Sequence, residues 1–282
     1  MIERAENWLI RAPGELERVE ACFSGRAFAP HRHDTYAIGI TLEGVQSFDY
    51  RGAPRHSLPG QLVILHPDEQ HDGRAGDGRS FRYRTAYIAP ADIQAVLAGR
   101  PLPFVSGAVR DEAPLRVAVM ALLGDYGRPL SVLEQQDGLY ELATALQAAA
   151  NASGEGSRVL GAANWEAASR ARDYIEASVE RDFCLVDLER ETRHDRWSLS
   201  RDFRRLFGTS PYRYLILRRL DRARALMLQG APLAQAACGA GFADQSHFNR
   251  LFKRAFGLTP MAWRRALNPH DRSIPGPGGR LN

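Results

Sequence analysis

The sequence predicts two domains, an N-terminal all-β barrel with a helical hairpin and a C-terminal all-α domain. Short segments of alternating polarity, separated by turn residues, continue to about residue 90. Two basic segments near the C-terminus then repeat each other at a separation of 49 positions. The positive charge is concentrated in the C-terminal half. Residues 165–282 hold 21 Lys or Arg against 13 Asp or Glu, whereas the whole chain of 282 residues has a net charge of only +4. The two halves are therefore expected to perform different tasks.

The first half has the pattern of a β-domain. Residues 36–42, 61–65 and 81–88 read as short strands, either alternating in polarity or uniformly apolar. Glycine, proline and aspartate gather between them, most densely in residues 51–54 and 72–78, and these residue types form tight turns. Such spacing is typical of an antiparallel barrel or sandwich, to which we assign residues 1–106.

Residues 107–150 change to a helical pattern. Leucines and valines recur there at steps of three and four, interrupted by residues 124–129, which predicts two antiparallel helices against the barrel. Residues 151–164 have the composition of a linker, and residues 269–282, rich in proline and glycine, that of a flexible tail.

The repeat pairs residues 200–211 with residues 249–260. Arg201 corresponds to Arg250 and Phe203 to Phe252, and each copy ends in Phe-Gly. Apolar residues lie at helical spacing, a glycine ends each helix, and the opposite face is basic.

Each basic helix follows a shorter helix and a tight turn. Residues 185–192 and 232–240 predict the short helices, and Asp195 is placed to cap the basic helix that begins at Arg196. A long helix from Pro211 to about Gln229 joins the two units. Helix, turn and helix in this order form a helix-turn-helix, whose second helix enters the DNA major groove. The balance of 14 basic against 3 acidic residues within residues 196–265 suits such a surface.

These residues carry a family resemblance. The run GFADQSHFNRLFKRAFGLTP, residues 241–260, with LSRDFRRLFGTSP upstream, resembles the signature of AraC/XylS-type transcription regulators over about residues 165–266. The resemblance implies that residues 165–268 bind double-stranded DNA, with two recognition helices in successive major grooves about 34 Å apart. It also implies RNA polymerase as a partner. In this family the helical hairpin pairs two protomers, so a homodimer and simple packing on the barrel both remain open.

The resemblance also predicts which side chains contact DNA, when the DNA-contacting positions of the family are transferred to this sequence one by one. Arg can bond guanine and Gln adenine bidentately, Ser and His offer single bonds, and Trp offers apolar contact to a thymine methyl. The predicted base-reading residues are Trp197, Ser200, Arg201, Gln245, Ser246, His247 and Arg250. The predicted phosphate contacts are Arg196, Arg204, Arg205, Arg213, Lys253 and Arg254. The alternatives are a solvated face for Arg201 and Arg250 and core packing for Trp197.

The first half has a resemblance of its own. Residues 30–36, PHRHDTY, followed by residues 59–71, resemble the cupin-type sensor domain found in many such regulators. A small barrel either fills with side chains or holds one small ligand. We assign His31, His33, Tyr36, His71 and Arg84 to an effector pocket, with an exposed Arg84 as the alternative.

Metal-binding cupins add a glutamate shortly after the His-x-His pair. Ala37 and Ile38 stand where it would fall, so we expect no metal and no other cofactor, although three histidines could still supply nitrogen ligands. The histidines are instead expected to bond backbone and support the barrel mouth. No catalytic residue is predicted.

Composition agrees with an intracellular protein of two domains. A hydrophobic content of 44% suffices for two cores. Cys22, Cys184 and Cys238 lack metal or redox spacing, and neither a signal peptide nor an 18-residue apolar segment is evident, which favours the cytoplasm.

The sequence thus predicts a sequence-specific transcription regulator controlled by a small-molecule effector in its barrel. Two alternatives remain: a metal-dependent cupin enzyme with a DNA-binding appendage, and an effector-independent regulator whose barrel only dimerises. Effector, operator, and the choice between activator and repressor are left open.

Overall fold

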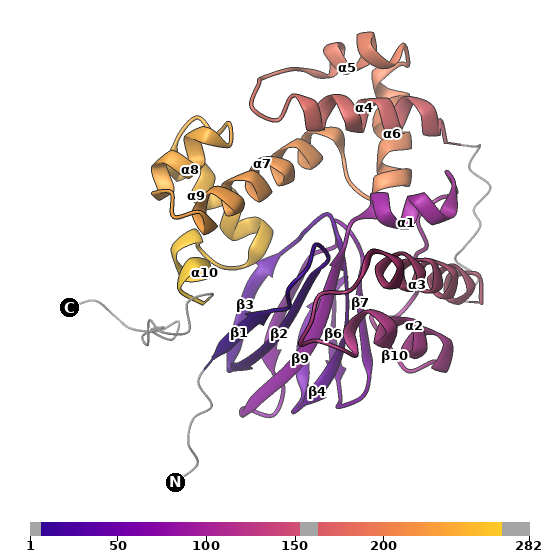
Figure 1. Ribbon diagram of the computed structural model, residues 1–282, viewed down its shortest axis with the longest axis vertical. Helices are drawn as coiled ribbons and strands as arrows, with labels where there is room; N and C mark the ends of the chain where they lie inside the picture. The colour runs from indigo at the N-terminus through magenta and orange to yellow at the C-terminus, as the bar shows by residue number, and fades with distance from the viewer. Residues whose placement is uncertain (1–6, 153–162, 267–282) are drawn as a thin grey trace.

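The computed structural model describes residues 7–152 and 163–266. The predicted tail and all but the ends of the predicted linker lie outside these residues. Two antiparallel sheets and a set of helices form the two predicted domains (Figure 1). Within the described residues, no helix is long and apolar enough to cross a membrane.

The N-terminal domain consists of two sheets of antiparallel strands. The first contains, in spatial order, β1 (Trp8–Arg11), β2 (Glu17–Ser24), β9 (Ser80–Ile88), β4 (Tyr36–Glu43), β7 (Leu62–Leu65) and β10 (Val109–Arg110). The second contains β3 (Arg26–His31), β8 (His71–Ala75), β5 (Gln46–Tyr50) and β6 (Ala53–Ser57). The three predicted strands are confirmed as β4, β7 and β9, and β4 lies between the other two in the first sheet.

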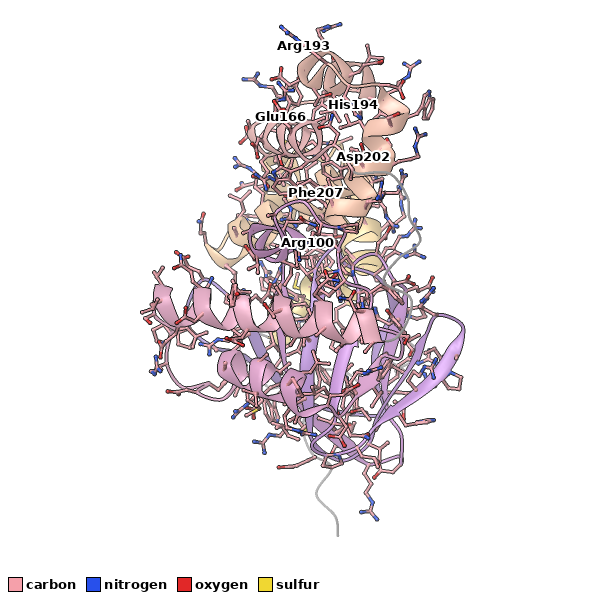
Figure 2. The ribbon with its side chains drawn as sticks, turned by 90° about the vertical axis from the view of Figure 1, so that its right-hand side faces the viewer. Arg100, Glu166, Arg193, His194, Asp202 and Phe207 are labelled. Atoms are coloured by element: carbon pink, nitrogen blue, oxygen red, sulfur yellow. The ribbon has the colours of Figure 1, made fainter. Side chains whose placement is uncertain are left out.

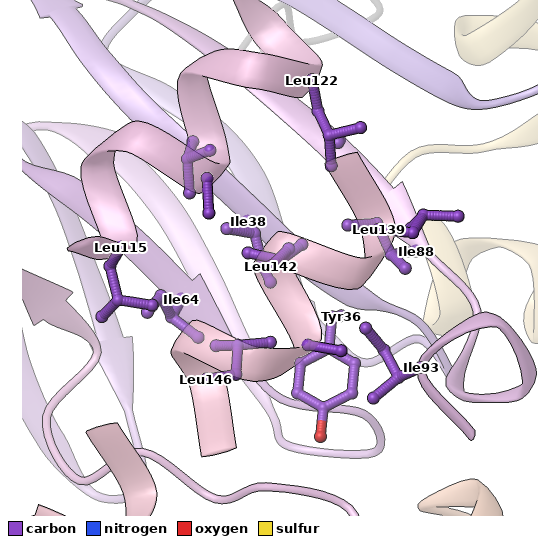
Figure 3. Packing of buried hydrophobic residues seen from close by; sticks show 14 of the residues in the cluster. Tyr36, Ile38, Ile64, Ile88, Ile93, Leu115, Leu122, Leu139, Leu142 and Leu146 are labelled. Carbon is purple, nitrogen blue, oxygen red and sulfur yellow. The ribbon is translucent and has the colours of Figure 1, made fainter. Parts of the chain in front are cut away.

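Helices cover the outer face of the first sheet. They are α1 (Pro90–Leu97), α2 (Ala113–Leu123) and α3 (Val132–Ala152). Tyr36, Ile38 and Ile40, at alternate positions of β4, join Leu142 and Leu146 of α3 in one buried cluster. Figure 3 shows this cluster, with Tyr36 and Ile38 labelled beside the leucines of α3. The hairpin therefore packs on its own barrel, and pairing of protomers through it stays a prediction.

A buried arginine fastens this hairpin to the sheet. Arg18 of β2 is 1% exposed, and its guanidinium donates to the carbonyls of Leu122, Asp125 and Arg128 around the α2–α3 connection. A fourth bond goes to the carbonyl of Pro13. These bonds satisfy the backbone of a turn that would otherwise be costly to bury.

The C-terminal domain has two helical units joined by one long helix. The helices are α4 (Trp165–Ala177), α5 (Leu185–Thr192), α6 (Arg196–Phe207), α7 (Pro211–Leu228), α8 (Leu233–Gly239), α9 (Gln245–Phe256) and α10 (Pro260–Ala266). Asp195 caps α6 as predicted, and Asp244 caps α9. Gly208 and Gly257 end the same two helices at φ 73° and 70°, a left-handed conformation that favours glycine.

The internal repeat extends to the packing of the two cores. Phe203 meets Tyr214 edge to face with ring centroids 5.5 Å apart. At the equivalent positions, Phe252 meets Trp263 at 5.8 Å in the same arrangement. Each helix-turn-helix therefore has its own aromatic core, built in the same way.

Candidate nucleic-acid interface and interdomain cavity

The first two turns of α6 and α9 present most of the predicted base-reading side chains to solvent. Arg201 is exposed on α6, as are Gln245, Ser246 and Arg250 on α9, while His247 is half-buried. Trp197 is 61% exposed, which excludes its packing in the core. An exposed indole beside arginines suits contact with a base edge.

Ser200 departs from this prediction. Its side chain is only 8% exposed, because it lies beside Leu199 on the inward side of α6. We therefore remove Ser200 from the base-reading set, and α6 presents fewer base-reading groups than α9.

The predicted phosphate contacts divide into two groups. Arg204, Lys253 and Arg254 are exposed, and Arg196 and Arg205 are half-buried. Arg213, at the start of α7, instead pairs with Asp68 of the barrel. In this arrangement Arg213 faces the barrel and is not available to DNA, which corrects the sequence prediction.

The C-terminal ends of both recognition helices rest on the barrel at equivalent positions of the repeat. The carbonyl of Arg205 accepts from the N–H of Leu102, at 3.3 Å, and the carbonyl of Arg254 from the N–H of Arg32, at 3.2 Å. Figure 2 shows Phe207 at the barrel end of α6, with His194 at the other end. The barrel thus contacts both recognition helices while their first turns remain exposed.

The glycines that end these helices contact the barrel as well. A Cβ on Gly208 would lie 2.6 Å from the Cβ of Pro67, and one on Gly257 would lie 3.0 Å from Nδ1 of His31. Only glycine fits this close approach, so the barrel and the recognition helices are packed tightly at both places.

Two further arginines of α7 pair with barrel carboxylates. Arg218 bonds Asp34 at 2.8 Å, and Arg224 bonds Glu17. Burial alone raises the pKa of the Glu17 carboxyl, but the positive charges of Arg224 and Arg11 outweigh burial and hold its pKa below the ordinary value. Glu17 is therefore ionised at neutral pH. The helix that joins the two DNA-binding units is thus attached to the barrel by charge.

A cavity of about 610 Å³ lies between the barrel and the C-terminal domain. A volume of this size holds a small organic molecule. Its barrel side includes His31, His33, His71, Tyr83, Thr85 and Tyr87, and its helical side includes Leu217, Arg218, Arg224, Phe256 and Trp263. Both domains therefore line the same cavity.

Three of the five residues that the sequence assigns to an effector pocket line this cavity, and the other two do not. His31, His33 and His71 line the cavity. Tyr36 does not, because its ring lies in the cluster under the hairpin and its hydroxyl donates to the carbonyl of Pro103. Arg84 is likewise on the outer face of its strand, where it pairs with Glu20. The alternation of side chains along β4 and β9 explains both errors.

Sequence reasoning missed the cationic side of the cavity. Arg218 and Arg224 look like any surface arginine of an amphipathic helix, and only the domain packing turns them inward. Their Nε atoms are buried and, among the described residues, donate to no acceptor. Buried donors of this kind favour an acceptor on a bound molecule.

The three cavity histidines form one cluster. Nδ1 of His31 lies 2.8 Å from the carbonyl of Ala29, that of His33 2.8 Å from Thr35, and that of His71 3.0 Å from Glu69. The predicted bonds to backbone are thus confirmed. Burial lowers the pKa of His33 to about 3, with His31 adding to the shift, and burial lowers the pKa of His31 and His71 as well. The cluster is therefore uncharged at neutral pH.

Two family models match the chain. The AraC-like ligand binding domain matches residues 13–143, and a helix-turn-helix domain matches residues 188–266. The uncharacterized HTH-type transcriptional regulator YbfI of Bacillus subtilis is 26% identical over 234 residues, covering 78% of this chain and 81% of that protein. The transcriptional activator RhaS of Escherichia fergusonii is 39% identical over 72 residues, which are 23% of this chain and 26% of RhaS. These relatives are transcriptional regulators rather than enzymes.

Among solved structures, ToxT of Vibrio cholerae has the same two-domain fold. Its structure superposes with a TM-score of 0.64 over 90% of this chain and 99% of ToxT, at 13% identity. A second ToxT structure, with an unsaturated fatty acid bound, gives a TM-score of 0.62 over 95% of this chain and 98% of ToxT, at 15% identity. At such identities the likeness shows the fold alone.

Proposed function

We propose that this chain, which belongs to the AraC family of transcription regulators, binds a specific operator through α6 and α9 under the control of a small molecule in the interdomain cavity. The cavity lined by both domains is the observation that carries this proposal. An effector changes DNA affinity only if it binds two arrangements of the protein differently. Contacts to both domains at once supply such a difference.

The same cavity favours an effector with an acidic group and an apolar body. Arg218 and Arg224 offer buried Nε donors, and guanidinium pairs well with carboxylate or phosphate. Phe256, Trp263 and Leu217 add apolar surface beside them. The fatty acid bound to ToxT, a protein of the same fold, has this chemistry.

An acidic effector would act on the α7–barrel contacts. It would compete with Glu17 for Arg224 and with Asp34 for Arg218, and so change how α7 rests on the barrel. Because the ends of α6 and α9 rest on the same barrel, their relative position would change with it. RNA polymerase and a second copy of the chain stay predicted partners.

Replacing Arg224 with Met is expected to weaken binding of such an effector. A hydrogen bond to a charged group contributes about 1.5–3 kcal/mol, or roughly a tenfold or greater loss of affinity. The effector is first identified by thermal-shift screening of organic acids against the full chain, since a ligand of the folded state raises Tm. Affinities of the wild-type and variant chains for that acid are then compared by calorimetry.

Arg222→Met is the matched control, because Arg222 belongs to the same helix but is exposed and pairs with Glu180. It should leave effector affinity unchanged. Equal affinity of the Arg224→Met and wild-type chains would contradict the assignment of Arg224. An effector that leaves DNA affinity unchanged would contradict the regulatory proposal.

A further inference from the structure

We propose that His31, His33 and His71 bind one divalent transition-metal ion at the barrel mouth. All three side chains are buried, and their candidate ligand nitrogens lie within 4.8 Å of one another. The ring centroids of His31 and His71 are 4.3 Å apart, and those of His33 and His71 are 4.8 Å apart. Two different segments of the chain thus bring three imidazoles together.

The hydrogen bonds of the three rings leave the right atoms for a metal. Each Nδ1 lies beside a backbone carbonyl, and a carbonyl oxygen can only accept, so each Nδ1 carries the proton. In a neutral ring Nε2 then keeps its lone pair. Among the described residues, no hydrogen bond uses Nε2 of these three rings. Metal-binding histidines are oriented in this way, by an N–H bond from the other ring nitrogen to a carbonyl.

His66 shows how a structural histidine of the same domain differs. Its Nδ1 is bonded to the hydroxyl of Tyr50 at 2.7 Å, and its Nε2 accepts from the N–H of Val105 at 3.0 Å. Both nitrogens are therefore used within the protein. The three cluster histidines use only one nitrogen each, which separates them from a histidine that serves packing.

The ligand set consists of imidazoles without a carboxylate. Asp72 and Glu17 line the same cavity, but Asp72 is bonded to Arg74 and Glu17 to Arg224. Among the described residues, the group of candidate ligand atoms contains these three histidines and no carboxylate, so the missing glutamate of the sequence pattern is not replaced from elsewhere. Three imidazoles suit zinc, iron, nickel or copper and leave a coordination position open toward the cavity.

The rings must move closer together to hold an ion. A tetrahedral ion about 2.1 Å from each nitrogen spaces the nitrogens about 3.4 Å apart, whereas the candidate ligand atoms lie within 4.8 Å of one another. The site also lies next to a recognition helix, because a Cβ on Gly257, at the end of α9, would lie 3.0 Å from Nδ1 of His31. A metal ion there would hold in place the barrel segment that the end of α9 contacts.

Metal titration of the full chain tests the proposal. The chain is stripped with a chelator, and Co²⁺ is added while its visible absorption is followed; Zn²⁺ is then titrated in competition. We expect one equivalent of Co²⁺ per chain, with absorption typical of low coordination, displaced by Zn²⁺. His33→Gln and His71→Gln should each weaken binding at least tenfold, whereas His56→Gln should leave it unchanged, because His56 is exposed and bonded to Ser47.

A second measurement needs no variant, in case a buried substitution prevents folding. Electron paramagnetic resonance of the Cu²⁺-loaded wild-type chain should show coupling to several imidazole nitrogens. No stoichiometric binding by the wild-type chain would overturn the proposal. So would equal losses in His71→Gln and His56→Gln, or a Cu²⁺ spectrum without imidazole nitrogen.

Discussion

Replacing Phe252 with Ala is expected to lower the free energy of unfolding of the second helix-turn-helix by about 3–5 kcal/mol. Phe252 is fully buried, and its ring packs against Phe248, Phe256 and Trp263 at centroid distances of 5.5, 4.6 and 5.8 Å. Alanine leaves a cavity among these aromatic rings, which cannot close over it. Urea denaturation of the full chain, followed by circular dichroism and tryptophan fluorescence, measures the loss.

The control for this prediction is an aromatic residue of the same domain that packs little. Tyr212 is 63% exposed, so Tyr212→Ala should change the free energy of unfolding by no more than about 0.5 kcal/mol. The equivalent core variant, Phe203→Ala, should cost about as much as Phe252→Ala, because the two copies pack alike. If Phe252→Ala lowers the free energy of unfolding only slightly, this aromatic core does not hold α9 in place.

The second large effect is expected at the DNA surface. Arg250→Ala should reduce discrimination between specific and random duplexes by about 1–3 kcal/mol, because a bidentate bond from arginine to guanine is sequence-specific. Arg250 is exposed on the second turn of α9 and lies one helical turn from Ser246. Competition binding of both duplexes to the wild-type and variant chains measures this loss of discrimination.

Lys253→Ala separates base reading from phosphate contact. Lys253 is exposed near the end of α9, where a contact would be to the DNA backbone. Its loss should weaken specific and random duplexes equally and reduce the salt dependence of binding. Equal losses on both duplexes for Arg250→Ala would assign Arg250 to a phosphate as well.

Local patterns explain which parts of the fold were predictable. The 49-residue repeat, the cap at Asp195 and the terminal Gly208 and Gly257 depend on residues a few positions apart, so the helices of the C-terminal domain could be placed closely. The strands at β4, β7 and β9 followed from polarity patterns in the same way. Patterns formed by residues a few positions apart can be read from a single sequence.

Two of the errors concern contacts between distant segments. Arg213 and Asp68 pair across 145 positions, and Arg84 meets Glu20 across 64. Tyr36, Ile38 and Ile40 lie at alternate positions of β4. This alternation alone places the Tyr36 side chain on the outer face of the strand rather than in the pocket. The interdomain cavity depends on how the barrel meets α7, which no local pattern records.

The central claim is that α6 and α9 read two adjacent major grooves of one operator. In vitro selection from random duplexes with the purified full chain, followed by hydroxyl-radical footprinting of the selected sequence, tests it most directly. The structure predicts a selected sequence with two protected segments about one helical turn, or roughly 10 base pairs, apart on one face of the duplex. Selection without any sequence preference, or protection of a single segment, would contradict the claim.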